Sequence, residues 1–294
     1  NIGMDGNLYV GGVVDVAGIS LSNNDAGTSN TIFGKNAGAS IDAGTNQNVA
    51  IGENTFDAST NDAVGNVIVG YQAGSDVTTG DKNTAIGFET GNAITTGDNN
   101  TFVGGLAGDA INTANDNTAI GYGSLTTAQT ASGSVAIGRD AGGTITTGNQ
   151  NIAIGYDALN GAATTGDNNV AIGVSAGDAL TSGKNNVAIG KQAFTRGTTS
   201  SENIAIGNNA LGQNTYTSSG SVAIGYFALG DSENGATNVG IGYRAGKGVT
   251  TGWSNVIIGK DAARQITTAR ENVVIGAGAY ESANSSENYA VVIG

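Results

Sequence analysis

A five-residue motif that ends in glycine recurs every 17 or 18 residues, and this period constrains the fold more than any other feature of the chain. A typical copy, residues 169 to 173, reads Asn-Val-Ala-Ile-Gly. Of the fifteen intervals between motif glycines, ten are 17 residues long and five are 18. Unrelated loops would not keep so constant a spacing, so we expect each interval to form one coil of a repeat structure. The sixteen motif glycines are Gly34, Gly52, Gly70, Gly87, Gly104, Gly121, Gly138, Gly155, Gly173, Gly190, Gly207, Gly225, Gly242, Gly259, Gly276 and Gly294.

The residues before each glycine have the pattern of a β-strand. Position two of the motif is Val, Ile or Thr in every copy, and position four is Ile, Val or Phe. Positions two and four share one face of a strand, and we expect that face to fill the interior of the coil. Position three, usually Ala and never charged, lies on the other face. Strands that are apolar on both faces are typical of sheets buried on both sides, so position three is predicted to pack against another copy of the chain.

Three further positions carry structural information. Position one is Asn in thirteen copies, and stacked Asn side chains can hydrogen-bond from coil to coil. The invariant glycine at position five indicates a positive φ or a place without room for a Cβ. Position eight is Ala in twelve of fifteen coils and Ser or Thr in the others, which indicates a tight corner.

The ninth and twelfth residues of each coil compensate for each other in size. Gly177 precedes Leu180, for example, whereas Leu159 precedes Ala162. Close-packed interiors disfavour both voids and overfilling. We therefore predict one slot per coil, on the same side as position three, that is filled by one bulky side chain from either position.

The rest of each coil is rich in Thr, Gly, Asp and Asn, which favour turns, and the difference between 17 and 18 residues is expected there. Residues 1–29 do not follow the period, although residues 7–16 alternate like a strand, so they are predicted to be a lead-in or cap. Residues 30–294 are predicted to form an all-β parallel solenoid shaft on the order of 70 Å long. Because the sequence opens on Asn1 and closes on a motif glycine, we expect it to be part of a longer chain.

Composition argues against several classes of function. The chain has no His, Cys or Pro, and its net charge of −13 disfavours nucleic acid and anionic membranes as partners. Without His or Cys, the common nucleophilic, acid–base and zinc sites cannot be assembled. No apolar run is long enough to cross a bilayer. We expect no enzymatic activity, no cofactor and no membrane insertion in this segment.

The Asn-Val-Ala-Ile-Gly motif and its small-residue corner resemble the head repeats of trimeric autotransporter adhesins and the repeats of phage tail fibres. The resemblance covers residues 30–294, and the long coils with Thr-Thr-Gly and Asn-Asn turns are more similar to the phage fibres. It implies a left-handed β-roll and a homotrimer of chains lying side by side. It also implies a structural role on a virion or cell surface, in which the fibre spaces or presents receptor-binding parts and contacts other fibre or virion proteins. An adhesin head on a bacterial surface is the alternative.

Candidate binding residues lie at the surface of the predicted coils. A host glycan could stack on aromatic rings, but the rings could equally pack between neighbouring coils, because the same place elsewhere holds Lys, Glu or Arg. Recurrent Thr-Thr pairs in the turns raise ice binding as a lesser alternative. Asp116 and Asp167, each followed by Asn, could offer oxygen ligands to calcium or serve only as turn residues. The candidate glycan contacts are Tyr71, Tyr122, Tyr156, Tyr226 and Tyr243, directly after a motif glycine, and Trp253 in a turn.

Overall fold

The computed structural model describes residues 29–58, 62–280 and 287–294. Almost all of the predicted lead-in segment, residues 1–29, lies outside the described residues. The described residues form a parallel β-solenoid without helices, which confirms the predicted all-β shaft.

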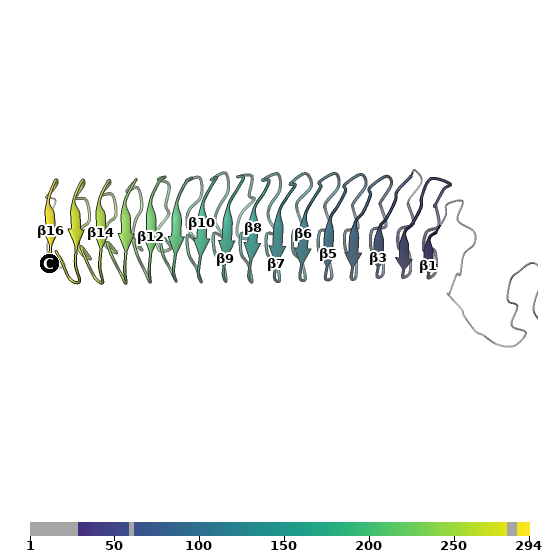
Figure 1. The fold of residues 1–294 in the computed structure, drawn as a ribbon, viewed down its shortest axis with the longest axis horizontal. Helices are drawn as coiled ribbons and strands as arrows, with labels where there is room; N and C mark the ends of the chain where they lie inside the picture. The colour runs from purple at the N-terminus through teal and green to yellow at the C-terminus, as the bar shows by residue number, and fades with distance from the viewer. Residues whose placement is uncertain (1–28, 59–61, 281–286) are drawn as a thin grey trace, which may run out of the picture.

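Sixteen three-residue strands form one parallel sheet in which every strand pairs with its neighbours in sequence. Figure 1 shows them as a ladder of arrows that point the same way along a straight rod. Equivalent motif positions are in register, so Ala171 lies beside Ala188. At about 4.8 Å per strand, the sheet is about 70 Å long. The strands are β1 (Thr31–Phe33), β2 (Val49–Ile51), β3 (Val67–Val69), β4 (Thr84–Ile86), β5 (Thr101–Val103), β6 (Thr118–Ile120), β7 (Val135–Ile137), β8 (Ile152–Ile154), β9 (Val170–Ile172), β10 (Val187–Ile189), β11 (Ile204–Ile206), β12 (Val222–Ile224), β13 (Val239–Ile241), β14 (Val256–Ile258), β15 (Val273–Ile275) and β16 (Val291–Ile293).

The two faces of the strand are the reverse of the sequence prediction. In β9, Ala171 is fully buried inside the coil, while Val170 and Ile172 are partly exposed on its outside. The middle residue is buried in the same way from β1 to β15. The prediction that positions two and four fill the coil was therefore wrong. The coil is narrow and already contains one bulky side chain from its far side, so only a small residue usually fits on the inner face of the strand.

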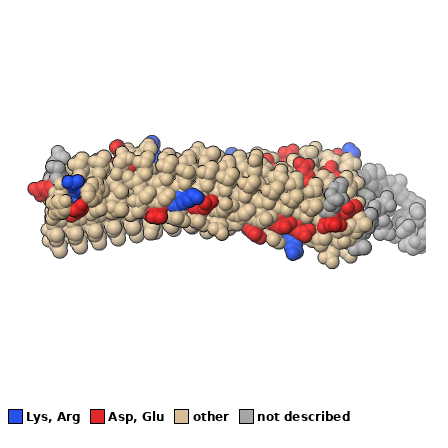
Figure 2. Space-filling model, turned by 90° about the horizontal axis from the view of Figure 1, so that it is seen from above, with Lys and Arg blue, Asp and Glu red and all other residues tan. Residues whose placement is uncertain are grey.

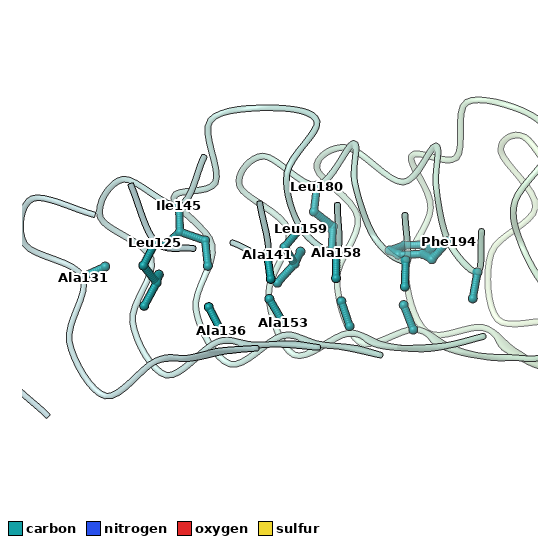
Figure 3. Packing of buried hydrophobic residues seen from close by; sticks show 14 of the residues in the cluster. Leu125, Ala131, Ala136, Ala141, Ile145, Ala153, Ala158, Leu159, Leu180 and Phe194 are labelled. Carbon is teal, nitrogen blue, oxygen red and sulfur yellow. The ribbon is translucent and has the colours of Figure 1, made fainter. Parts of the chain in front are cut away.

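That bulky side chain occupies the predicted slot. Leu159, a ninth residue, and Leu180, a twelfth residue, are both buried in the core. A Cβ added at Gly177 would lie 3.3 Å from Leu180 Cδ1, and a Cβ added at Gly197 would lie 2.5 Å from Phe194 Cε1. The two positions therefore share one space, as their compensating sizes predicted. Figure 3 shows Ala136 and Ala153 projecting from the sheet toward Leu125, Ile145 and Leu159.

Position three is a third contributor to the slot, which the comparison of only two positions missed. Phe102 is fully buried, and a Cβ added at Gly108 would lie 2.8 Å from its ring. Ile257 similarly reaches back over the preceding coil, where a Cβ added at Gly246 would lie 2.8 Å from Ile257 Cδ1. A bulky inner residue on the strand therefore requires small residues opposite it and in neighbouring coils.

A buried ladder of Asn side chains runs along the rod at motif position one, as the sequence suggested. Asn169 Oδ1 accepts hydrogen bonds from the backbone N–H and the Nδ2 of Asn186, both at 3.0 Å. Asn169 Nδ2 donates across its own coil to the carbonyl of Gly183 at 2.9 Å. The ladder thus satisfies buried backbone groups on both sides of each coil, which would otherwise be costly to bury.

Tyr216 repairs the ladder at one of its interruptions. Ser221 replaces Asn at position one, so no amide is available for the carbonyl of Gly235 fourteen residues later. The Tyr216 hydroxyl hydrogen-bonds to that carbonyl at 3.0 Å and to Ser221 Oγ at 2.7 Å. Burial raises the pKa of Tyr216 to about 12. A tyrosine from the preceding turn therefore takes over the role of the missing Asn side chain.

The motif glycine and the turn behave as predicted. Gly173 has a φ of +133°, and a Cβ added there would lie 2.6 Å from the carbonyl oxygen of Gly190. In the 18-residue coil that follows β8, Gly161 still pairs with the next coil, but the amide of Asn151 bonds Gly166, one residue later than in 17-residue coils. The extra residue therefore lies in the turn.

Candidate functional site

The longest continuous surface feature is the outer face of the sheet. We call it the outer strip and define it as the first and last residues of strands β1 to β16. These 32 positions hold only Val, Ile, Thr and Phe, without a single charge. Several of them, such as Ile120 and Ile137, are more than a third exposed. Single exposed apolar residues are ordinary, but an apolar surface that runs the whole length of a rod is typical of an interaction surface.

Aromatic side chains line one edge of the outer strip, at the position directly after the motif glycine. Tyr71 stacks on Phe88 with a centroid distance of 5.4 Å, and Tyr226 stacks on Tyr243 at 5.2 Å. All four rings remain at least 40% exposed. These residues therefore form rungs between neighbouring coils and still present part of each ring to solvent, so both readings of the sequence remain compatible with the geometry.

The other predicted glycan contacts are dispersed. Tyr122 and Tyr156 lie two coils apart, with Arg139 in the coil between them, and the Arg139 guanidinium lies 5.8 Å from the ring centroid of Tyr156. Trp253 precedes a strand, at the end opposite to the tyrosines, and packs under Arg270 at 5.2 Å. Of the six predicted residues, the structure brings only Tyr226 and Tyr243 into contact with each other.

The candidate calcium ligands are engaged in hydrogen bonds. Asp167 Oδ1 accepts from the backbone N–H of Asn149 at 2.9 Å, and its Oδ2 lies 2.7 Å from Lys184 Nζ. The hydrogen bond from Lys184 holds the pKa of Asp167 below its usual range. Asn117 and Asn169 belong to the buried ladder. Within residues 29–58, 62–280 and 287–294, no group of three acidic, His or Cys side chains is placed to hold a metal ion.

The Thr-Thr pairs do not form an unbroken array. The hydroxyl of Thr78 donates to the carbonyl of Thr95 at 3.0 Å, and that of Thr250 donates to Thr267 at 3.1 Å. Asn112 and Glu233 occupy the equivalent place in other coils. The first threonine of these pairs therefore ties one coil to the next.

Charge is unevenly distributed along the rod. Five of the 11 Lys and Arg residues, but only two of the 24 Asp and Glu residues, lie between residues 238 and 280. In the face shown in Figure 2, acidic side chains gather toward the N-terminal end. The C-terminal coils are therefore locally basic within an acidic chain.

A depression of about 260 Å³ lies in these coils, around the corner from the outer strip. We call its lining the basic corner. Lys247 Nζ lies 5.8 Å from the ring centroid of Phe227 and pairs with Asp231 at 3.2 Å, while the Arg264 Nε lies 4.0 Å from Asp261. The residues of the basic corner are Tyr226, Phe227, Arg244, Lys247 and Arg264.

Arg244 differs from the other two cations of the basic corner. Its guanidinium lies 4.8 Å from the ring centroid of Tyr243, and among the described residues it takes part in no ion pair. The search for aromatic residues found Tyr226 and Tyr243 but missed Phe227 and the three cations. The clustering of basic residues between 238 and 280 was the available signal.

No protein-family model matches this chain, and no curated protein or solved structure is significantly similar to it. Among the described residues, no helix is long and apolar enough to cross a membrane.

Proposed function

We propose that this chain is a structural segment of a phage tail fibre, which spaces or presents the parts that bind the host receptor. The observation that carries the proposal is the uninterrupted sheet from β1 to β16, which continues through every coil in one register. A rod of this kind covers distance with little material, because each coil contacts only its neighbours. We expect it on a virion, in contact with other fibre proteins.

The outer strip supports self-association as part of this function. The strip is about 70 Å long and one three-residue strand, or about 10 Å, wide, which gives about 700 Å². Stable protein complexes bury about 800 Å² on each partner. A second copy of the same chain offers a matching apolar strip of equal length, whereas a compact partner would cover only part of it.

We propose that three copies assemble, with left-handed coils, as the resemblance to fibre repeats implies. Each strip has two rows of side chains, one from the first and one from the last residue of each strand. Around a threefold axis, each row would face a different neighbour, and closed symmetry would leave no strip uncovered.

Electron microscopy combined with a mass measurement on the full chain tests this proposal. The expected result is a rod whose repeat region is about 70 Å long and whose mass is three times the 28.8 kDa of one chain. The matched control carries Lys at Ile137, Ile172 and Ile206, which charges the strip without altering the coil interior. It should be a monomer that keeps the β-rich circular dichroism spectrum. A compact globular particle would contradict the fibre function, and a monomeric rod would contradict the assembly.

A further inference from the structure

We propose that the basic corner binds an anionic saccharide, that is, a sugar ring that carries a carboxylate or phosphate group. The site rests on the proposed fibre function for its biological setting, but not for its chemistry. Two features point to this ligand class: cations concentrated against the overall charge of the chain, and aromatic rings beside them.

Arg244 provides the anion contact. The guanidinium is half-buried, lies beside the Tyr243 ring, and has no carboxylate partner among the described residues. Its planar fork of N–H donors can bind a carboxylate or phosphate through two parallel hydrogen bonds. Lys247 and Arg264 are already paired with Asp231 and Asp261, so they add positive potential and leave Arg244 as the group to be satisfied by a ligand.

The rings provide the contact for the sugar body. Tyr226 is 41% exposed and packs edge-on against Phe227 at a centroid distance of 4.5 Å, so the two rings form an angled wall beside the cations. Aromatic rings can pack against the apolar C–H faces of sugars. The volume of about 260 Å³ lies below the roughly 300 to 1,000 Å³ of pockets for drug-sized ligands, which suits one or two sugar rings.

Other depressions along the rod lack this combination. One, lined by Ala93, Ala110, Asn112, Thr113, Gln129 and Thr130, has no charged or aromatic residue. Another, between Gly161 and Thr198, has Asp178 and Arg196 but no ring, and burial raises the pKa of Asp178. The coil geometry thus produces shallow hollows at several places, and only the basic corner joins cations to aromatic rings among these.

An acidic peptide would also be attracted to the cations, but the observations favour a sugar. The depression is short and closed by the wall of Tyr226 and Phe227, whereas an extended acidic peptide needs a row of cations. Along the neighbouring coils, Asp231 and Asp261 would repel the further charges of such a peptide.

Titration of the full chain with glucuronic acid, followed by isothermal calorimetry, tests the proposal. Glucose is the neutral probe, inorganic phosphate the probe for charge alone, and a poly-glutamate peptide the probe for acidic protein segments. The expected result is saturable binding of glucuronic acid, with glucose, phosphate and the peptide each at least about fivefold weaker.

Arg244→Gln and Tyr226→Ala should each weaken glucuronic acid binding at least about fivefold. Arg139→Gln is the matched control, because Arg139 also lies beside a tyrosine but lines none of the depressions described above, and it should leave binding unchanged. The proposal is overturned by an absence of saturable binding, by equal binding of phosphate or the peptide, or by an equal loss in Arg139→Gln. None of these results would change the rod shape or the mass of the assembly, so the fibre function would stand or fall separately.

Discussion

The two sides of each strand are both apolar, yet they do different work. The inner side presents a single small residue, such as Ala171, to a narrow core that contains the Asn ladder and one bulky side chain per coil. The outer side presents two β-branched residues, such as Val170 and Ile172, which contact nothing else in the chain but their equivalents in adjacent strands. The difference shows that hydrophobicity alone does not identify the interior of a solenoid. The volume that remains inside the coil decides which face turns inward.

The sharpest way to break this comparison is to place the same charge on either side of one strand. Ala171→Asp would bury a carboxylate without a partner, so we expect it to destabilise the chain by at least about 4 kcal/mol. Val170→Asp, one residue earlier and on the outer strip, should cost less than about 1 kcal/mol in the separated chain. Urea unfolding followed by circular dichroism measures both. Similar losses in the two variants would show that the strand faces are not distinguished as described.

The next largest effect should come from the Asn ladder. Asn169→Ala would leave the carbonyl of Gly183 and the backbone N–H of Asn186 buried without partners, at a cost of about 3 kcal/mol. Asn169→Ser keeps an acceptor for the next coil, as Ser134 does for Asn151, and should lose only about half as much. Urea unfolding compares the two. If the serine variant were as unstable as the alanine variant, the ladder would not act through its acceptor.

Tyr216 should have a smaller effect, because it serves one interruption of the ladder. Tyr216→Phe removes the hydroxyl that satisfies Gly235, and we expect a loss of about 1.5 kcal/mol. The raised pKa, about 12 against an ordinary value of 10.0, means that the folded state favours the neutral phenol. This contribution is complete below pH 10 and is lost as the pH rises toward 12.

The wild-type chain should therefore lose stability between about pH 10 and 12, and the Tyr216→Phe variant should lose less over the same interval. Unfolding at a series of pH values checks this, with Tyr122→Phe as the control for an exposed tyrosine. Parallel losses in Tyr216→Phe and the wild type would contradict the assigned role.

Much of the shaft followed from the sequence. The period defined the coils, the invariant glycine indicated the positive φ at Gly173, and the exchange of size between the ninth and twelfth positions located the slot filled by Leu159 or Leu180. The facing of the strand did not follow, because alternation shows that Ala171 and Ile172 lie on opposite faces without showing which is inner. Tyr216 was also missed, since its role depends on the carbonyl of Gly235 one coil away. The basic corner was missed because its residues come from three coils and share no motif.

The smallest effect on the stability of a single chain, and the largest on assembly, is expected on the outer strip. Ile172→Lys leaves the interior unchanged, so the free energy of unfolding of the separated chain should change by less than about 0.5 kcal/mol. Its charge would be buried between copies, so self-association should weaken at least tenfold, or by about 1.4 kcal/mol. Sedimentation equilibrium measures this. Ile172→Val, which keeps an apolar β-branched side chain, should assemble normally.

The most direct test of the inward alanine and the outer strip is the thiol-labelling rate of Ile172→Cys, since the natural chain contains no cysteine. The account predicts that this thiol is protected at concentrations where the chain is assembled and is labelled rapidly once dilution separates the copies. Ala171→Cys should remain protected under both conditions, because its side chain lies inside the coil. Rapid labelling of Ile172→Cys in the assembled protein, or of Ala171→Cys in the folded single chain, would contradict the account.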